Sequence, residues 1–224
     1  AFHGAINSLA QTVLKIAAPG VPDFYQGTEL WDFSFVDPDN RRPVDFSLRR
    51  RILADLMELE RNNPQALLDR LLDSPRDGAI KLYVVYKGLQ LRRNQARVFL
   101  QGEYLPLAVA GEMTEHVCAF ARCYDSQWVV AVVPRLLAEY GASLAELRDL
   151  WAGNELLLPP LAGLRWSNVF TGETVRAHMT AKGQALSLSE IFARFPVALL
   201  QAEASADGPL TFPQIEESAL GIVP

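Results

Sequence analysis

The sequence lacks the features that mark secreted, membrane-spanning and nucleic-acid-binding proteins. Only 2 of its 224 residues are cysteine, which excludes a disulfide scaffold. It has 26 Asp and Glu against 21 Lys and Arg, so its net charge of −5 offers no basic surface to nucleic acid. No apolar run approaches the ~20 residues of a membrane span, and no signal-peptide pattern opens the chain. We expect a soluble, cytoplasmic protein without nucleic-acid or membrane partners.

Further absences narrow the function. Neither G-x-G-x-x-G nor G-x-x-x-x-G-K-[ST] occurs, so nucleotide binding is not supported. The histidines, His3, His116 and His178, are far apart and adjoin no nucleophile-elbow motif. The chain starts with AFHGAINSLAQ, without Met and already inside an amphipathic repeat. We therefore expect its natural beginning to lie upstream.

The hydrophobic residues, 50% of the chain, suffice for one or two cores and first recur at helical spacing. An apolar stripe over residues 6–16 predicts a helix that stops before Pro19-Gly20. Residues 21–25 predict a short buried strand, and a polar loop follows to about Asp45. Helix, strand and loop in this order indicate an α/β unit.

More helices follow the loop. Ser47 is the expected N-cap of a helix whose apolar stripe runs from Leu48 to Leu59. Residues 65–73 predict a short helix, and a turn follows at residues 74–78. Residues 79–94 include the strand-like string KLYVVY, but their length favours a helix.

From residue 102 the pattern changes to short apolar runs separated by Gly, Pro and Asn, which indicates an antiparallel sandwich or barrel. The predicted strands lie in residues 103–109, 115–124, 127–134, 154–159, 166–172, 173–179, 184–189 and 195–203. A helical excursion is expected at residues 142–150. These patterns divide the chain into residues 1–95, a β domain at 96–201 and a peripheral tail at 202–224.

The cysteines and tryptophans of the β region have two interpretations each. Because Cys118 and Cys123 are five residues apart, a regular strand would point them to opposite faces, so they cannot bridge each other. A metal site formed with His116 fits no zinc spacing and lacks a fourth ligand, so buried structural thiols are favoured. Three tryptophans could stack on sugar rings, although core packing is favoured. They are Trp128, Trp151 and Trp166.

Residues 19–51 carry the chemistry. They read PGVPDFYQGTELWDFSFVDPDNRRPVDFSLRRR, a loop that mixes carboxylates, arginines and aromatic rings. Aromatic faces stack on sugar rings, and charged groups bind their hydroxyls, so the loop is typical of a carbohydrate site. The alternative is a surface loop whose acids pair with Arg41, Arg42 and residues 49–51.

The strings PGVPDFYQGTELWD and VDPDNRRPVDF closely resemble the maltooligosyltrehalose synthases, the (1→4)-α-D-glucan 1-α-D-glucosylmutases of the α-amylase superfamily. The superfamily signature G-x-P-x-x-Y-x-G-x-E lies on the last barrel strand and the loop after it. It is matched here by Gly20, Pro22, Tyr25, Gly27 and Glu29. The likeness continues through LRRNQARVFLQGEYLPL, AFAR, VVPR, Trp151, the FTG turn and FPVALL, and covers nearly the whole chain.

This resemblance implies an intramolecular transglycosylation. The reducing-end α-1,4 bond of a maltooligosaccharide would be broken with retention, and the retained glucose would be rejoined through an α,α-1,1 bond. A retaining site needs two carboxyl groups ~5 Å apart. It implies no nucleotide, metal or redox cofactor. By resemblance, a maltooligosyltrehalose trehalohydrolase would act as the functional partner enzyme.

The catalytic carboxylates of the family lie upstream of the PGVPDFYQG string, so no catalytic residue is expected in this chain. A complete barrel needs ~200 residues or more, whereas only about 95 precede the β region. The expected fold is the end of a TIM (β/α)8 barrel, with extra helices, followed by an antiparallel β-sandwich. The missing N-terminal barrel portion is then a partner, and the stripe of residues 6–16 is expected to be exposed.

The resemblance also suggests which residues contact the glucan. Glu29 is expected to orient the loop, while an Asp23 and Glu29 pair remains the alternative for catalysis within this chain. The residues expected near the sugar are Tyr25, Gln26, Asp37, Asn40, Arg41 and Arg42. Two other functions stay open: a non-catalytic carbohydrate-binding module, and a portion of an α-glucan hydrolase or transferase.

Overall fold

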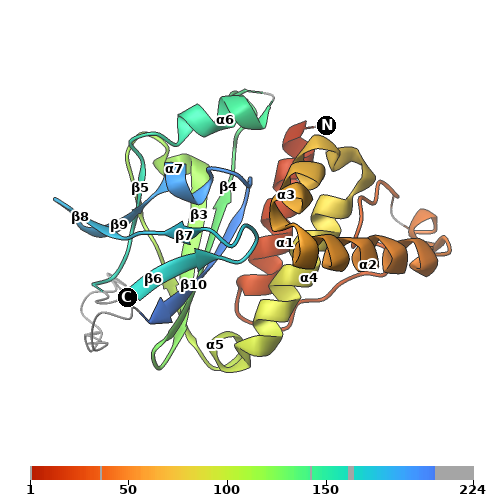
Figure 1. Ribbon diagram of the computed structural model, residues 1–224, viewed down its shortest axis with the longest axis horizontal. Coiled ribbons are helices and arrows are strands. Elements are labelled where there is room, and N and C mark those ends of the chain that lie inside the picture. Colours follow the sequence, from red (N-terminus) through yellow and green to blue (C-terminus); the bar gives the residue numbers. More distant parts are fainter. Residues whose placement is uncertain (1, 36, 142, 161–163, 205–224) are drawn as a thin grey trace.

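A computed structural model describes residues 2–35, 37–141, 143–160 and 164–204 of the chain (Figure 1). The predicted tail at 202–224 lies outside the described residues beyond Ala204. Helices gather on one side of the molecule and strands on the other, with two short helices beside the strands (Figure 1). The helices are α1 (Phe2–Ala17), α2 (Phe46–Asn62), α3 (Pro64–Asp73), α4 (Ala79–Asn94), α5 (Ala96–Leu100), α6 (Leu144–Leu150) and α7 (Leu188–Ile191).

The strands form two antiparallel sheets. Six strands pair in the order β1-β3-β4-β10-β6-β7, and four pair in the order β2-β5-β9-β8. Each predicted strand run contains all or part of at least one observed strand. The bounds are β1 (Glu103–Pro106), β2 (Val109–Ala110), β3 (Val117–Tyr124), β4 (Gln127–Pro134), β5 (Glu155–Leu157), β6 (Leu164–Asn168), β7 (Thr174–Val175), β8 (His178–Thr180), β9 (Gly183–Ser187) and β10 (Ala198–Ala204).

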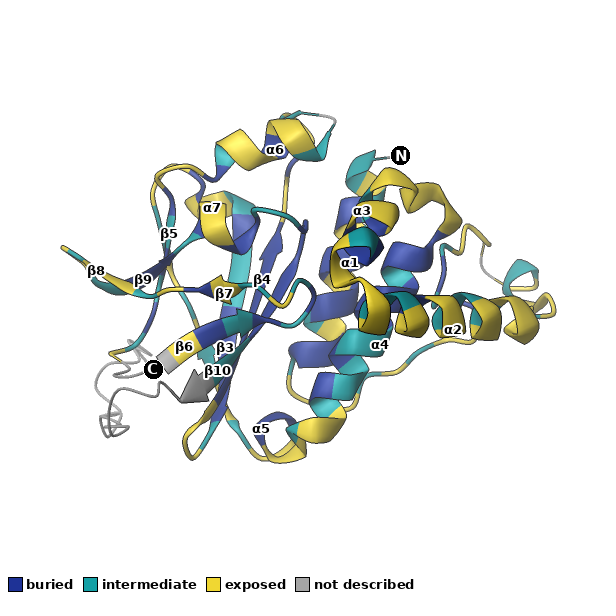
Figure 2. Cartoon of the chain, viewed as in Figure 1, coloured by how far each residue is buried: buried dark blue, intermediate teal, exposed yellow. Residues whose placement is uncertain are grey.

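The six-stranded sheet is buried on both faces. Along β4, Val130 and Val132 join a core shared with the four-stranded sheet, whereas Val129, Ala131 and Val133 join a core shared with the helices. Successive side chains of a strand point to opposite faces, so one apolar run serves both cores. The helices and the four-stranded sheet therefore cover opposite faces of the central sheet (Figure 2).

The helix α1 packs against α4 and β4 through the stripe that the sequence marks. The predicted exposure of this stripe is wrong, because Ile6, Leu9, Val13 and Ile16 are each at most 4% exposed. Gly88 of α4 allows the close approach, since a Cβ there would lie 2.9 Å from Cδ1 of Ile16. The chain thus covers this face with its own helix and sheet.

The strand predicted at residues 21–25 is absent. This described segment has no regular secondary structure, and Val21 is 86% exposed. A strand needs a neighbour to pair its backbone groups, and no strand of the described residues lies alongside it. The predicted helix-strand-helix order is therefore observed here as helix, loop and helix.

The helix α2 begins earlier than predicted. Its N-cap is Asp45, whose Oδ1 accepts a hydrogen bond of 2.8 Å from the backbone N of Leu48, whereas Ser47 lies inside the first turn. Only Leu56 of its stripe is fully buried, and Leu48 is 36% exposed. The long axis of α2 points away from the sheets (Figure 1). We refer to residues 19–62, the motif loop together with α2, as the arm.

The short predicted helices are observed. Asn63 caps α3 by accepting from the backbone N of Ala66 at 3.0 Å, and Pro64 occupies its first turn. The stretch 79–94 is the helix α4, and the excursion at 142–150 contains α6. The short helix α5 was not predicted. No helix among the described residues is long and apolar enough to cross a membrane.

Candidate functional site

Hydrogen bonds hold the backbone where the motif loop begins, at the end of α1. Arg92 of α4 donates hydrogen bonds to the carbonyl oxygens of Ile16, at 2.6 Å, and Gly20. The buried Arg122 of β3 donates to the carbonyl of Ala17 at 3.3 Å. Two guanidinium groups thus bind the carbonyls at the negative C-terminal end of α1. The first residues of the loop are held relative to α4 and the sheet.

Glu29 connects the loop to α2. Its Oε2 accepts from the backbone N of Gly27 at 3.1 Å and from Nε of Arg49 at 2.9 Å. Arg49 also donates to the carbonyl of Gly27 at 2.6 Å. Gly27 has φ 95°, a left-handed conformation that a side chain would strain. Glu29 is thus bonded both within the loop and to α2, and its role in orienting the loop stays a prediction. Because its carboxylate is already bound, the geometry does not favour the alternative of a catalytic Asp23 and Glu29 pair.

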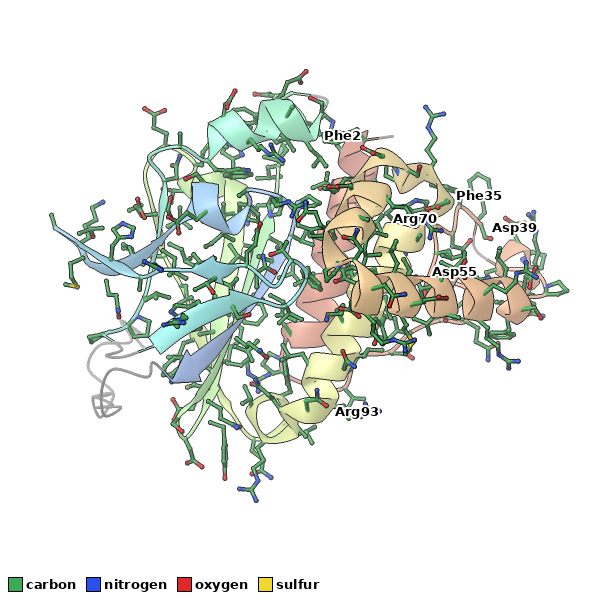
Figure 3. The ribbon with its side chains drawn as sticks, in the orientation of Figure 1. Phe2, Phe35, Asp39, Asp55, Arg70 and Arg93 are labelled. Atoms are coloured by element: carbon green, nitrogen blue, oxygen red, sulfur yellow. The ribbon has the colours of Figure 1, made fainter. Side chains whose placement is uncertain are left out.

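Leu30 and Trp31 anchor the middle of the loop. Leu30 is buried in the helical core, and Trp31 packs against that core. The indole Nε1 of Trp31 donates to the carbonyl of Pro75 at 2.6 Å. Beyond these anchors the loop turns outward, and Phe33 and Phe35 are 88% and 83% exposed. Phe35 lies on the outer side of the helices, away from the sheets (Figure 3).

The segment 37–42 binds mainly to itself. Arg41 forms an ion pair with Asp37 and Arg42 forms one with Asp39, while the side chains of both arginines are more than 70% exposed. Asp39 also accepts from the backbone N of Phe35 at 2.8 Å. These contacts match the surface-loop alternative, in which acids pair with nearby arginines. A role of this segment in sugar binding stays a prediction.

Asn40 differs from its neighbours. Its Oδ1 is buried and has no hydrogen-bond partner among the described residues. A buried carbonyl oxygen without a donor costs about 1–3 kcal/mol. A donor that reached this oxygen would remove the cost, and a role of Asn40 in sugar binding stays a prediction.

A groove lies between α1, the loop and the start of α4. Its volume is about 360 Å³, and its wall is mostly polar. The lining residues are Ser8, Gln11, Thr12, Lys15, Asp23, Phe24, Tyr25, Thr28 and Lys81. Of the residues expected near the sugar it contains only Tyr25, and of the alternative catalytic pair only Asp23. The structure does not bring Gln26, Glu29, Asp37, Asn40, Arg41 and Arg42 into its wall.

The lysines of this groove were missed by the sequence reasoning. On α1, polar residues recur at positions 8, 11, 12 and 15, a helical spacing opposite the apolar stripe that could have signalled a second functional face. No comparable signal marks Lys81, which lies 66 positions after Lys15 and reaches the groove because α4 packs against α1.

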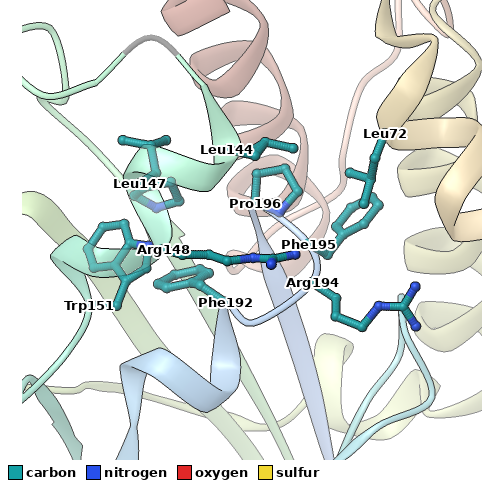
Figure 4. Close-up of a pocket in the computed structure, with 10 residues that line it drawn as sticks. Leu72, Leu144, Leu147, Arg148, Trp151, Phe192, Arg194, Phe195 and Pro196 are labelled. Carbon is teal, nitrogen blue, oxygen red and sulfur yellow. The ribbon is translucent and has the colours of Figure 1, made fainter.

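The tryptophans form no sugar-stacking platform. Trp128, Trp151 and Trp166 are all at most 5% exposed and belong to the core between the two sheets, which confirms core packing. Trp151 also borders a cavity of about 30 Å³ between α6 and the segment after α7, together with Phe192 and Arg148 (Figure 4). This cavity holds about one water molecule, which is too small for a sugar ring.

The cysteines lie as the strand pattern predicts. Cys118 packs against the helical core and Cys123 belongs to the core between the sheets, on opposite faces of β3. Both thiols are free. Burial raises the pKa of Cys123 to about 11. Among the described residues, no group of three His, Cys, Asp or Glu side chains could hold a metal ion.

The chain is similar to known proteins over nearly its full length. A curated protein of Mycobacterium tuberculosis named maltooligosyl trehalose synthase is 35% identical over 198 residues, or 88% of this chain and 21% of the relative. The solved maltooligosyltrehalose synthase of Arthrobacter ramosus matches 90% of this chain and 23% of its own, at 33% identity and a TM-score of 0.66. Another solved maltooligosyl trehalose synthase matches at 31% identity and a TM-score of 0.56.

These matches confirm the resemblance that the loop indicates. The chain spans about a fifth of the length of the curated relatives it matches. No family model matches it.

Proposed function

Because this chain is homologous to part of the maltooligosyl trehalose synthases, we propose that it is the C-terminal part of such an enzyme, acting in trehalose biosynthesis. The reaction would convert the reducing-end α-1,4 bond of a maltooligosaccharide into an α,α-1,1 bond, which is an isomerase activity. The observation that carries this proposal is the match over 88% of the chain.

The chain is proposed to be inactive alone. The catalytic carboxylates would lie in the remaining part of the enzyme, an N-terminal barrel portion that would pack against the arm. The exposed apolar side chains of the arm support this idea, because Val21, Phe33 and Phe35 are each more than 80% exposed. Most other large hydrophobic side chains are covered by the core.

Within the completed enzyme, the arm is proposed to form the rim of the glucan site. Tyr25 and Gln26 lie at its start, and Asn40 brings a buried oxygen without a donor. Arg41 and Arg42 have exposed guanidinium groups that could bind sugar hydroxyls. Asp37 would hold Arg41 in place, as it does here. Glu29 would act indirectly, by fixing the loop against Arg49.

The test is to restore the missing part. This chain would be co-expressed with the portion of the Mycobacterium tuberculosis relative that it does not match, and the purified pair incubated with maltopentaose. We expect a non-reducing product, seen as loss of reducing ends without release of glucose. Release of glucose and maltose alone would contradict the mutase activity and favour an α-glucan hydrolase.

The second candidate function is a non-catalytic carbohydrate-binding module, favoured by the two sheets. The isolated β region is a poor reagent for it, because the helices cover Phe120, Val129 and Leu199 on one face of the central sheet. Calorimetry with the full chain and maltooligosaccharides is the better experiment. Millimolar binding that is unchanged in Tyr25→Ala would favour a module in the sheets.

The cellular location of the protein and its partner enzyme are also proposals. We propose a cytoplasmic protein, which the two free thiols support. A maltooligosyltrehalose trehalohydrolase would release trehalose from its product.

A further inference from the structure

Two of the four lysines in the sequence face the same groove. The chain has Lys15, Lys81, Lys87 and Lys182, and otherwise uses arginine for its positive charge. Lys15 and Lys81 both line the groove between α1, the loop and α4, although they come from different helices. Lys87, in contrast, is paired with Glu60 at 2.6 Å.

The two groove lysines are held in place without a carboxylate partner. Nζ of Lys15 lies 3.8 Å from the centroid of the Phe24 ring, and Nζ of Lys81 lies 5.7 Å from that of Trp31. Neither lysine forms an ion pair with a carboxylate in the part of the chain that the structure describes. Aromatic rings fix the direction of an ammonium group without pairing its charge with a carboxylate.

The ammonium groups of the groove disfavour each other. Burial lowers the pKa of Lys81, and the charge of Lys15 lowers it further, while Asp32 and Glu29 act in the opposite direction. Two like charges that face one cavity repel each other, and an anion placed between them removes this cost. The two ammonium groups therefore favour an anionic group in this groove.

The rest of the wall is suited to hydroxyl groups. Thr12 donates its proton to the carbonyl of Ser8, and Thr28 donates to that of Tyr25, each at 2.7 Å. Both threonine oxygens can therefore act only as acceptors toward the groove. Asp23 adds a carboxylate acceptor, and Tyr25 adds an aromatic ring. Acceptors beside an aromatic ring match the hydroxyls and the apolar face of a sugar.

We propose that this groove binds a hexose phosphate, with the phosphate between Lys15 and Lys81 and the sugar hydroxyls toward Asp23, Thr12 and Thr28. A volume of about 360 Å³ is in the range of small-ligand sites and suits a single sugar ring rather than a long glucan. This site goes beyond the proposed reaction, whose maltooligosaccharide substrate carries no charge.

The test is calorimetric titration of the full chain with glucose 6-phosphate near neutral pH, in parallel with inorganic phosphate, glucose and maltose. We expect glucose 6-phosphate to bind about tenfold more tightly than any of the other three compounds, because only it offers both a phosphate to the lysines and hydroxyls to the acceptors of the wall. If maltose or glucose binds as tightly, the groove is a neutral sugar site. If inorganic phosphate binds as tightly, the sugar is not recognised. Either result overturns the proposal, as does the absence of binding by glucose 6-phosphate.

Variants locate the site. Lys15→Met and Lys81→Met keep the apolar stem and remove the charge, and each should weaken glucose 6-phosphate binding by about tenfold or more. Lys81→Arg keeps the charge and should retain most of the affinity. Lys182→Met, on the exposed turn after β8, is the matched control and should bind as the unchanged protein does. Equal weakening by Lys182→Met, or full affinity in both groove variants, would overturn the proposal.

Thermal unfolding of each variant separates loss of the site from loss of the fold. The binding result is also independent of the mutase assay, because it needs only this chain. Failure of the restored enzyme to form a non-reducing product would leave the groove intact, and failure of the groove to bind would leave the proposed reaction intact.

Discussion

The central sheet and the arm are built in opposite ways. The sheet is covered on both faces: β4 is buried from Trp128 to Pro134, and Ala198, Leu199 and Leu200 of β10 are buried as well. The arm has two main apolar anchors, Leu30 and Leu56, and otherwise depends on polar contacts such as that of Glu29 with Arg49 (Figure 2). Packing therefore stabilises the sheet, whereas hydrogen bonds set the shape of the arm. The motif that carries the family resemblance lies in the less packed region.

The largest contrast should appear when an aromatic ring is removed from each region. Trp166 of β6 is fully buried, so Trp166→Ala should lower the free energy of unfolding by about 3–5 kcal/mol. Phe33 of the arm is 88% exposed, and Phe33→Ser should change it by less than about 0.5 kcal/mol. Urea unfolding of both variants measures the difference. Similar losses for the two would show that the arm is packed in solution.

The buried arginine of β3 tests the junction between the regions. Arg122 donates to the carbonyls of Ala17, Phe99, Gly102 and Glu103. Arg122→Met should lower the free energy of unfolding by about 3 kcal/mol, because buried carbonyls lose a charged donor. Exposed Arg50 of α2 is the matched control, and Arg50→Met should have little effect in the same urea titration. If the two variants lost the same free energy of unfolding, the hydrogen bonds of Arg122 would not be important for stability.

A smaller effect is expected when the polar connection within the arm is weakened. Glu29→Gln keeps the shape of the side chain but removes the charge that binds Arg49, and should cost about 1 kcal/mol or less. The amide of Gly27, which donates to Glu29, should exchange its hydrogen faster, while amides of β4 should not. Hydrogen exchange measured residue by residue checks this. Faster exchange in both regions would mean that the arm and the sheet open together.

The reactivity of the two cysteines reports on the two faces of the sheet. Half-buried Cys118 should react with a thiol reagent faster than buried Cys123. Since the pKa of Cys123 is raised from 9.0 to about 11, its thiol stays protonated in the folded protein, and stability should fall as the pH rises between these values. Cys118→Ala and Cys123→Ala identify each reaction. Faster labelling of Cys123 would place that face of the sheet in contact with solvent.

The sequence patterns predicted the elements that local rules determine. The stripe of α1, the short helix at residues 65–73 and the alternation that places Cys118 and Cys123 on opposite faces depend on local pattern alone. The N-cap of α2 was misplaced because Asp45 and Ser47 are both suitable capping residues, and the contact with Leu48 decides between them.

The other wrong or missing predictions share one cause, which is that they depend on contacts between residues far apart in the sequence. The composition of residues 21–25 suits a strand, but strand formation depends on a neighbour that the sequence window does not contain. The stripe of residues 6–16 was expected to be exposed because the missing barrel portion was taken as its cover, whereas its actual partners, α4 and β4, lie far along the chain. The pairing of Lys15 with Lys81 in one groove depends on the same long-range packing.

The contacts of Arg92 and Arg122 with the end of α1 couple the packing of the sheet and α4 to the direction of the motif loop. Both arginines hold carbonyls at the point where the motif loop departs, and they come from α4 and from a strand of the central sheet. A small change in how the sheet packs would therefore alter the direction in which the loop leaves the body, without touching any residue of the motif. For protein engineering, the positions that would tune the direction of the loop lie on β3 and α4, outside the motif itself.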